Sequence, residues 1–174
     1  MELTKVSAQP WKSDSPIAEA LRATFEDLAF EEPYPAEETA ISTDRSIFIK
    51  VDVLDPPIGG TILALNLEVA WELYAAMSGA LPDKTPEDEV VLDAMSELTN
   101  IFTGKVLKLV LPIGQQFKLS LPETIEPGGN LQVEKCVRFS VGLSMGTLDA
   151  FIIGAVMIDY LSTVKREEAQ ISAV

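Results

Sequence analysis

The sequence predicts an α+β fold, with an antiparallel-rich sheet and helices packed on one face of it. Apolar residues recur at the helical spacing of three and four in two segments, 16–29 and 86–109. Residues 45–53 and 61–67 have strand character and flank the turn-forming sequence LDPPIGG. The overall order is helix, two strands, two helices and three strands, which is typical of an α+β domain.

The first helix is expected at residues 16–29. Ser15 suits the N-cap position, and Pro16 suits the first turn because its missing N–H needs no partner there. The acidic, proline-containing sequence EEPYPAEE (31–38) then ends the helix. We expect this segment to be a solvated connector rather than a binding tail, and we assign it no function.

Two more helices are expected after the hairpin-like pair of strands. Residues 67–78 form the first, closed by Gly79 at a C-cap position. The long helix is expected to take Thr85 as its cap, to place Pro86 at its first position, and to run to about Leu109.

The C-terminal part of the domain is expected to be β-structure joined by the turns EPGGN and SMGT. One domain is expected at 14–158, preceded by a flexible lead-in at 1–13 and followed by a tail or short helix at 159–174. The three expected strand segments are 115–125, 131–144 and 148–161.

The composition excludes several classes of function. With 174 residues and a net charge of −14, the chain is poorly suited to nucleic acid or an anionic membrane surface. It has no histidine, which excludes Ser-His and Cys-His catalysis and histidine metal sites. A single cysteine, no signal-peptide pattern and no apolar run near ~20 residues favour a cytoplasmic protein without a membrane segment.

The long helix carries an unusual polar stripe. Asp93, Glu97, Asn100 and Gly104 fall on one face at a spacing of 3.6 residues per turn. Asn, Thr and Gly are poor helix formers. Because the apolar residues of this segment lie on the opposite side of the helix, we expect the stripe to point away from the core. Small polar residues flank it: Ser96, Thr99 and Thr103. The residues expected to face the sheet are Val91, Ala94, Met95, Leu98, Ile101, Phe102 and Leu109.

Spacing alone favours a simple solvated face for this stripe, and it leaves a functional face open. Only Asp93 and Glu97 could bind a metal, which is too few ligands for a site of its own. An amide beside a carboxylate could instead hold a water molecule and pair with a lysine of a partner. Gly104 would allow close approach. Such a set could complete the active site of another protein.

The segment EDEVVLDAMSELTNIFTGKVLK resembles the signature of the CheC/CheX/FliY family of response-regulator phosphatases. That signature is Asp or Ser, three residues, Glu, two residues and Asn, with Pro about twenty residues later. Asp93, Glu97, Asn100 and Pro122 match it, and Gly104 matches a recurrent glycine of the family. The preceding GGTILALNLEVAWELYAAMSG also resembles the family, and the likeness covers about residues 14–158.

The resemblance implies a phosphatase acting on the phospho-aspartate of a CheY-like receiver domain, in chemotaxis or related two-component signalling. By this likeness Asn100 positions the attacking water and Glu97 pairs with the active-site lysine of the receiver. Asp93, Gly104, Ser96 and Thr103 would support or bind. The receiver would supply Mg²⁺, and the protein would need no cofactor of its own.

One signature per chain places the protein with the CheX-like branch, which implies a homodimer with a continued sheet. The apolar C-terminal strands are the candidate edge. The net charge of −14 is unfavourable for docking onto an acidic receiver pocket. Two alternatives stay open: a catalytically weak module that sequesters a phosphorylated receiver, and a structural oligomerisation domain with an incidental stripe.

Overall fold

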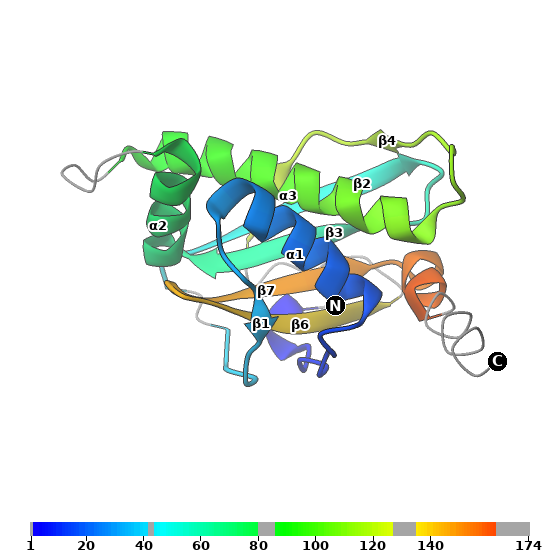
Figure 1. The fold of residues 1–174 in the computed structure, drawn as a ribbon, viewed down its shortest axis with the longest axis horizontal. Helices are drawn as coiled ribbons and strands as arrows, with labels where there is room; N and C mark the ends of the chain where they lie inside the picture. The colour runs from blue at the N-terminus through cyan, green and yellow to red at the C-terminus, as the bar shows by residue number, and fades with distance from the viewer. Residues whose placement is uncertain (1, 42–43, 80–85, 127–134, 163–174) are drawn as a thin grey trace.

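The computed structural model describes residues 2–41, 44–79, 86–126 and 135–162, and the predicted α+β architecture is confirmed (Figure 1). One sheet has the strand order β1-β6-β7-β3-β2-β4, with β5 also pairing with β2, and all these pairs are antiparallel. The strands are β1 (Tyr34–Pro35), β2 (Ser46–Asp55), β3 (Gly59–Asn66), β4 (Lys118–Leu119), β5 (Glu123–Thr124), β6 (Cys136–Leu143) and β7 (Gly146–Ile153). The helices are η1 (Leu3–Lys5), α1 (Pro16–Ala29), α2 (Leu67–Ser78) and α3 (Asp88–Val110).

Helices α1, α2 and α3 cover the same face of the sheet (Figure 1). The capping residues explain why α1 and α2 begin where the sequence predicts. The Ser15 hydroxyl accepts a hydrogen bond from the Ala18 N–H at 3.3 Å, and the Asn66 side chain accepts one from the Val69 N–H at 2.8 Å. Gly79 closes α2 in the left-handed conformation with φ 65°, as expected.

Helix α3 begins two residues later than predicted. Glu87 is the N-cap and has extended backbone angles, so Pro86 lies outside the helix. Its side chain makes no capping hydrogen bond, and Asp88 and Glu89 in the first turn stabilise the positive end of the helix dipole instead. The expected cap Thr85 lies outside the described residues.

The prediction of one continuous strand at 148–161 is wrong in its second half. Strand β7 ends at Ile153, and residues 155–162 are helical. Gly154 makes the change of direction with φ +96°, and a Cβ there would lie 2.6 Å from the Gly59 Cα. The apolar run therefore contributes first to the sheet and then, through the buried Met157 and Ile158, to the core beneath the helices.

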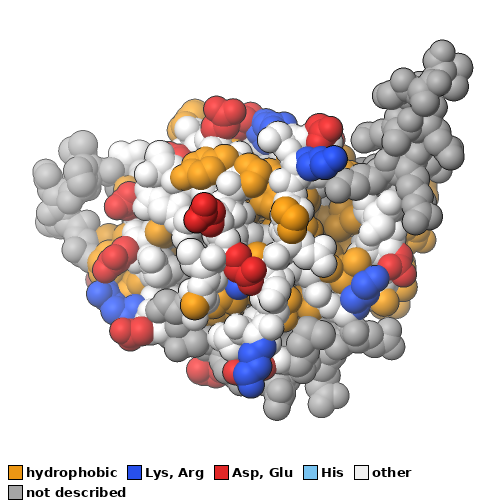
Figure 2. Space-filling model, turned by 90° about the horizontal axis from the view of Figure 1, so that it is seen from below, with side chains coloured by type: hydrophobic (Ala, Val, Ile, Leu, Met, Phe, Trp, Pro, Cys, Tyr) orange, Lys and Arg blue, Asp and Glu red, His pale blue; other side chains and the backbone are white. Residues whose placement is uncertain are grey.

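The lead-in packs against the domain instead of lying free as a flexible segment. Leu3 is fully buried on the sheet face opposite the helices, together with Phe48, Ile62 and Phe151. Figure 2 shows the molecule from below, with patches of hydrophobic side chains and with charged side chains between and around them. Trp11 crosses to the helix side, where its indole N–H donates to the Ser140 carbonyl at 2.9 Å.

A buried ion pair fastens this lead-in to the sheet. Arg138 on β6, with a side chain 3% exposed, donates from Nε and Nη2 to the two carboxylate oxygens of Asp149 on β7, at 2.9 and 3.0 Å. Its guanidinium also donates to the backbone carbonyls of Val6 and Thr39. The acidic connector is held here too, because Glu38 lies 3.8 Å from the Arg138 guanidinium.

The C-terminal strands are not at an edge of the sheet, so the predicted dimer edge is wrong. Strand β7 lies between β3 and β6. The outer side of β6 is occupied by β1 and by Ala8, which bridges to Arg138. The described edges are instead short strands: β1 on one side, and β4 and β5, which both pair with β2, on the other.

Candidate functional site on helix α3

The predicted polar stripe lies on the surface of α3. Asp93, Glu97 and Asn100 are exposed, and Gly104 and Ser96 are half-buried. At a rise of 1.5 Å per residue, the stripe from Asp93 to Gly104 is about 16 Å long. Within the described residues the carboxylates of Asp93 and Glu97 have no ion pair or hydrogen bond to another part of the chain, which leaves both available to a partner.

Thr103, which we expected beside the exposed stripe, is in the core. Its side chain and that of Thr99 are fully buried. The Thr103 hydroxyl lies 2.6 Å from the hydroxyl of Thr61 on β3 and 2.7 Å from the Thr99 carbonyl, and the Thr99 hydroxyl donates to the Met95 carbonyl. Both buried hydroxyls are therefore hydrogen-bonded, to backbone carbonyls one turn back in α3 and, for Thr103, also to β3. They explain part of the poor helix propensity structurally.

Asn100 and Gly104 have no such explanation inside the chain. Asn100 makes no hydrogen bond within the described residues, and a Cβ added to Gly104 would meet no atom within 4 Å. Nothing described packs against the bare backbone of this turn. Poor helix formers at these two positions therefore indicate a role in contact with a partner outside the chain.

We predict that Gly104→Ala raises the free energy of unfolding by about 0.5–1 kcal/mol, because alanine suits a helix interior better than glycine and the space is open. Urea denaturation measures this change. Gly79→Ala is the matched control: its Cβ also meets nothing, but its φ of +65° is strained for alanine, so that variant is expected to lose stability. A destabilised Gly104→Ala would show that this glycine has a structural role.

The remaining side chains on this face include some that sequence reasoning missed. Val90 is 41% exposed, and Ile101, expected in the core, is half-buried. Lys108 is exposed four residues after Gly104, a spacing that places both on the same face and that could have identified it. Its neighbour Lys105 is bound to Asp27 of α1 at 2.9 Å.

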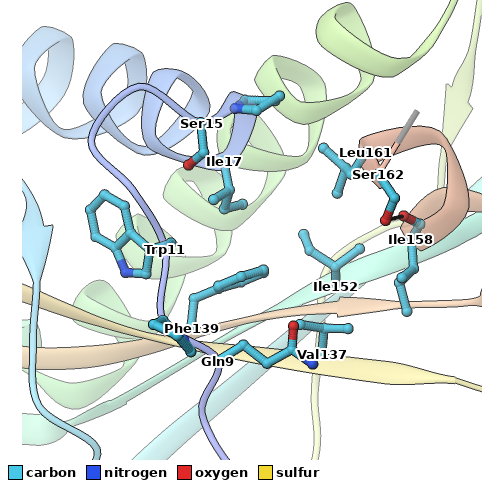
Figure 3. A pocket seen from close by; sticks show the side chains of 12 residues that line it. Gln9, Trp11, Ser15, Ile17, Val137, Phe139, Ile152, Ile158, Leu161 and Ser162 are labelled. Atoms are coloured by element: carbon cyan, nitrogen blue, oxygen red, sulfur yellow. Dashed lines mark hydrogen bonds between the residues drawn. The ribbon is translucent and has the colours of Figure 1, made fainter. Parts of the chain in front are cut away.

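A hollow in the described structure lies away from α3 (Figure 3). The start of α1, strands β6 and β7 and the helix at 155–162 surround it, and none of its lining residues is titratable. Trp11, Ile17, Phe139 and Ile152 point into it from several elements (Figure 3). Such a lining suits apolar packing and offers no acid or base to activate the hydroxyls of Ser15 and Ser162.

The described chain also offers no activated nucleophile or metal cage. Burial raises the pKa of the Cys136 thiol to about 11, which keeps it protonated and unreactive at neutral pH. In the part of the chain that the structure describes, no three Asp, Glu or Cys side chains come together as metal ligands. None of the described helices is both long and apolar enough to cross a membrane.

The α3 stripe is therefore convex, polar and incomplete as an active site. An exposed carboxamide can donate and accept hydrogen bonds without titrating, and Glu97 one turn away can pair with a cation. Neither group can hydrolyse a substrate without further groups opposite them. The arrangement suits insertion into a concave site on another protein.

A comparison with protein-family models matches residues 47–142 to the family described as "Chemotaxis phosphatase CheX", and this segment contains all of α3. No curated protein matches the chain.

Among solved structures, the chain is similar to the chemotaxis protein CheX from Vibrio vulnificus (21% identity, TM-score 0.59, covering 79% of this chain and 93% of that one). It is also similar to a chain of the CheX–CheY–BeF3–Mg²⁺ complex from Borrelia burgdorferi (16%, 0.56, 79% and 94%). A third is FliY of Thermotoga maritima (14%, 0.57, 87% and 92%). These structures share its fold, and the family match covers more than half of its length. The chain belongs to the CheX family of chemotaxis phosphatases.

Proposed function

We propose that this protein hydrolyses the phospho-aspartate of a CheY-like receiver domain, with α3 inserted into the receiver's phosphorylation pocket. The observation that carries the proposal is the exposed pair Glu97 and Asn100, which has no partner within the described chain. Membership of the CheX family supports the reaction class. A partner of this kind supplies the concave site that the helix lacks.

In this mechanism the Asn100 carboxamide holds a water molecule in line with the phosphorus–oxygen bond that will break. The water attacks phosphorus, aspartate leaves as a carboxylate, and inorganic phosphate is released. No covalent intermediate forms on this chain. Positioning and electrostatic stabilisation dominate such phosphoryl transfers, and a hundredfold gain corresponds to ~2.7 kcal/mol of barrier.

Glu97 fixes the register of the two proteins by pairing with the receiver's active-site lysine. Asp93, one turn before Glu97, and Ser96, one turn before Asn100, line the same approach. Gly104 keeps the following turn bare for close contact. The Mg²⁺ needed for the chemistry belongs to the receiver and neutralises charge on the phosphoryl group.

The test is the decay of a phosphorylated CheY-type receiver with Mg²⁺, followed by phosphate release with and without this protein. Faster decay that increases with protein concentration supports the proposal. Binding without faster decay supports the alternative of a sequestering module. Neither binding nor faster decay with several receivers would contradict both and leave the stripe a solvated face.

We also propose that the protein is a homodimer, with its interface at a sheet edge that β6 and β7 do not form. Sedimentation equilibrium at micromolar concentration is expected to give about twice the 18.9 kDa chain mass. A monomer over the whole concentration range would contradict this expectation without affecting the proposed chemistry.

A further inference from the structure

Lys108 is an exposed cation on the functional face of α3. It lies in the last turn of the helix, four residues beyond Gly104. Within the described residues it has no ion pair, whereas Lys105, the other lysine of α3, is neutralised by Asp27 at 2.9 Å. Lys108 is thus the unpaired positive charge of this face.

The geometry directs Lys108 back over the stripe. Side chains on a helix lean toward its N-terminus, so the lysine stem extends over the turn that holds Gly104. That turn is bare, since a Cβ at Gly104 would meet nothing within 4 Å. Asn100 and Lys108 are separated by about 12 Å along the axis, more than a four-carbon stem covers. The ammonium therefore reaches the surroundings of the Asn100 site and not the reacting atoms.

The charge balance makes such a cation useful. The chain carries a net charge of −14, which is unfavourable for its approach to an acidic phosphorylation pocket. The stripe itself begins with two acids, Asp93 and Glu97, which favour a basic group of the partner. Lys108 supplies the opposite charge at the other end of the same face.

We propose that Lys108 is a positioning residue that pairs with acidic side chains at the rim of the receiver's phosphorylation pocket. This inference rests on the proposed function. Acids at one end of the stripe and a base at the other fix one orientation of the receiver, with Asn100 between them. A lysine in the last turn also interacts favourably with the helix dipole. That role would affect the stability of this protein, whereas the proposed role affects its binding to the receiver.

The test measures decay of the phosphorylated receiver against protein concentration for wild type, Lys108→Glu and Lys108→Arg. Lys5→Glu is the control for net charge. It changes the net charge equally, and although it also removes the ion pair of Lys5 with Glu2, it lies in η1, on the sheet face opposite α3. Lys108→Glu replaces an attraction by a like-charge repulsion, so we expect it to raise the half-saturating concentration by about 5- to 20-fold and to leave the maximal rate unchanged. Lys108→Arg should behave like wild type, and Lys5→Glu should stay within about twofold.

Added salt provides a second readout, because screening weakens exposed charge pairs. The gap between wild type and Lys108→Glu should narrow as ionic strength rises. Equal shifts for Lys108→Glu and Lys5→Glu, or a lower maximal rate at unchanged half-saturation, would overturn the inference. If wild type accelerates decay and Lys108→Glu has the same half-saturating concentration and rate, only this inference is overturned. Wild type without any acceleration overturns the proposed function itself.

Discussion

Asn100→Ala is expected to lose the acceleration of receiver dephosphorylation by about 100-fold, which corresponds to ~2.7 kcal/mol of barrier. Asn100 is exposed and makes no hydrogen bond within the described chain, so its removal leaves the fold intact. Alanine also has a higher helix propensity than asparagine. The loss should therefore appear in the maximal rate, while binding to the phosphorylated receiver and the urea midpoint stay close to wild type.

Gln116→Ala provides the control for this experiment. It also removes an exposed carboxamide, but from the loop that follows α3, and it should keep the full rate. A normal rate in Asn100→Ala would contradict water positioning by this residue. An equal loss in both variants would indicate a general effect of amide removal and would also contradict the assignment.

Asp149→Ala is expected to have the largest effect on stability, a loss of about 3–5 kcal/mol in the free energy of unfolding. The substitution leaves the guanidinium of Arg138 buried without its bidentate partner, and it removes the acceptor of the Ser140 hydroxyl. Arg138 also holds the carbonyls of Val6 and Thr39, so both the lead-in and the connector should loosen. Urea denaturation measures the first effect, and hydrogen exchange at residues 3–9 measures the second.

Glu26→Ala is the comparison for a surface pair. Glu26 lies 3.6 Å from Arg22 with both side chains well exposed, and such pairs contribute about 0–1 kcal/mol. If Asp149→Ala lowered the free energy of unfolding by no more than Glu26→Ala does, the buried pair would not be what holds the lead-in against the sheet.

The elements that sequence reasoning predicted well are those set by local chemistry. Ser15 and Pro16 mark the start of α1, and Gly79 marks the end of α2, because caps and turns depend on a few neighbouring residues. The hairpin of β2 and β3 follows in the same way from its pattern and turn. The exposed positions of Asp93, Glu97 and Asn100 followed from helical spacing alone.

The features that were missed depend on contacts between distant segments. Thr103 is buried because Thr61, from another strand, satisfies its hydroxyl. The lead-in packs because Arg138, more than a hundred residues away, binds its carbonyl. The apolar run after β7 turns into a helix because Gly154 packs against Gly59. A one-dimensional pattern does not contain these pairings, so it predicted a surface threonine, a flexible segment and a longer strand.

The most direct test of the central claim is a crystal structure of this protein bound to a CheY-type receiver with Mg²⁺ and beryllofluoride in place of the phosphoryl group. We predict that α3 enters the receiver pocket, with the Asn100 carboxamide within hydrogen-bonding distance of the attacking-water position. Glu97 should pair with the receiver's lysine. A complex in which α3 faces solvent, or in which Asn100 lies far from the beryllofluoride, would contradict the account.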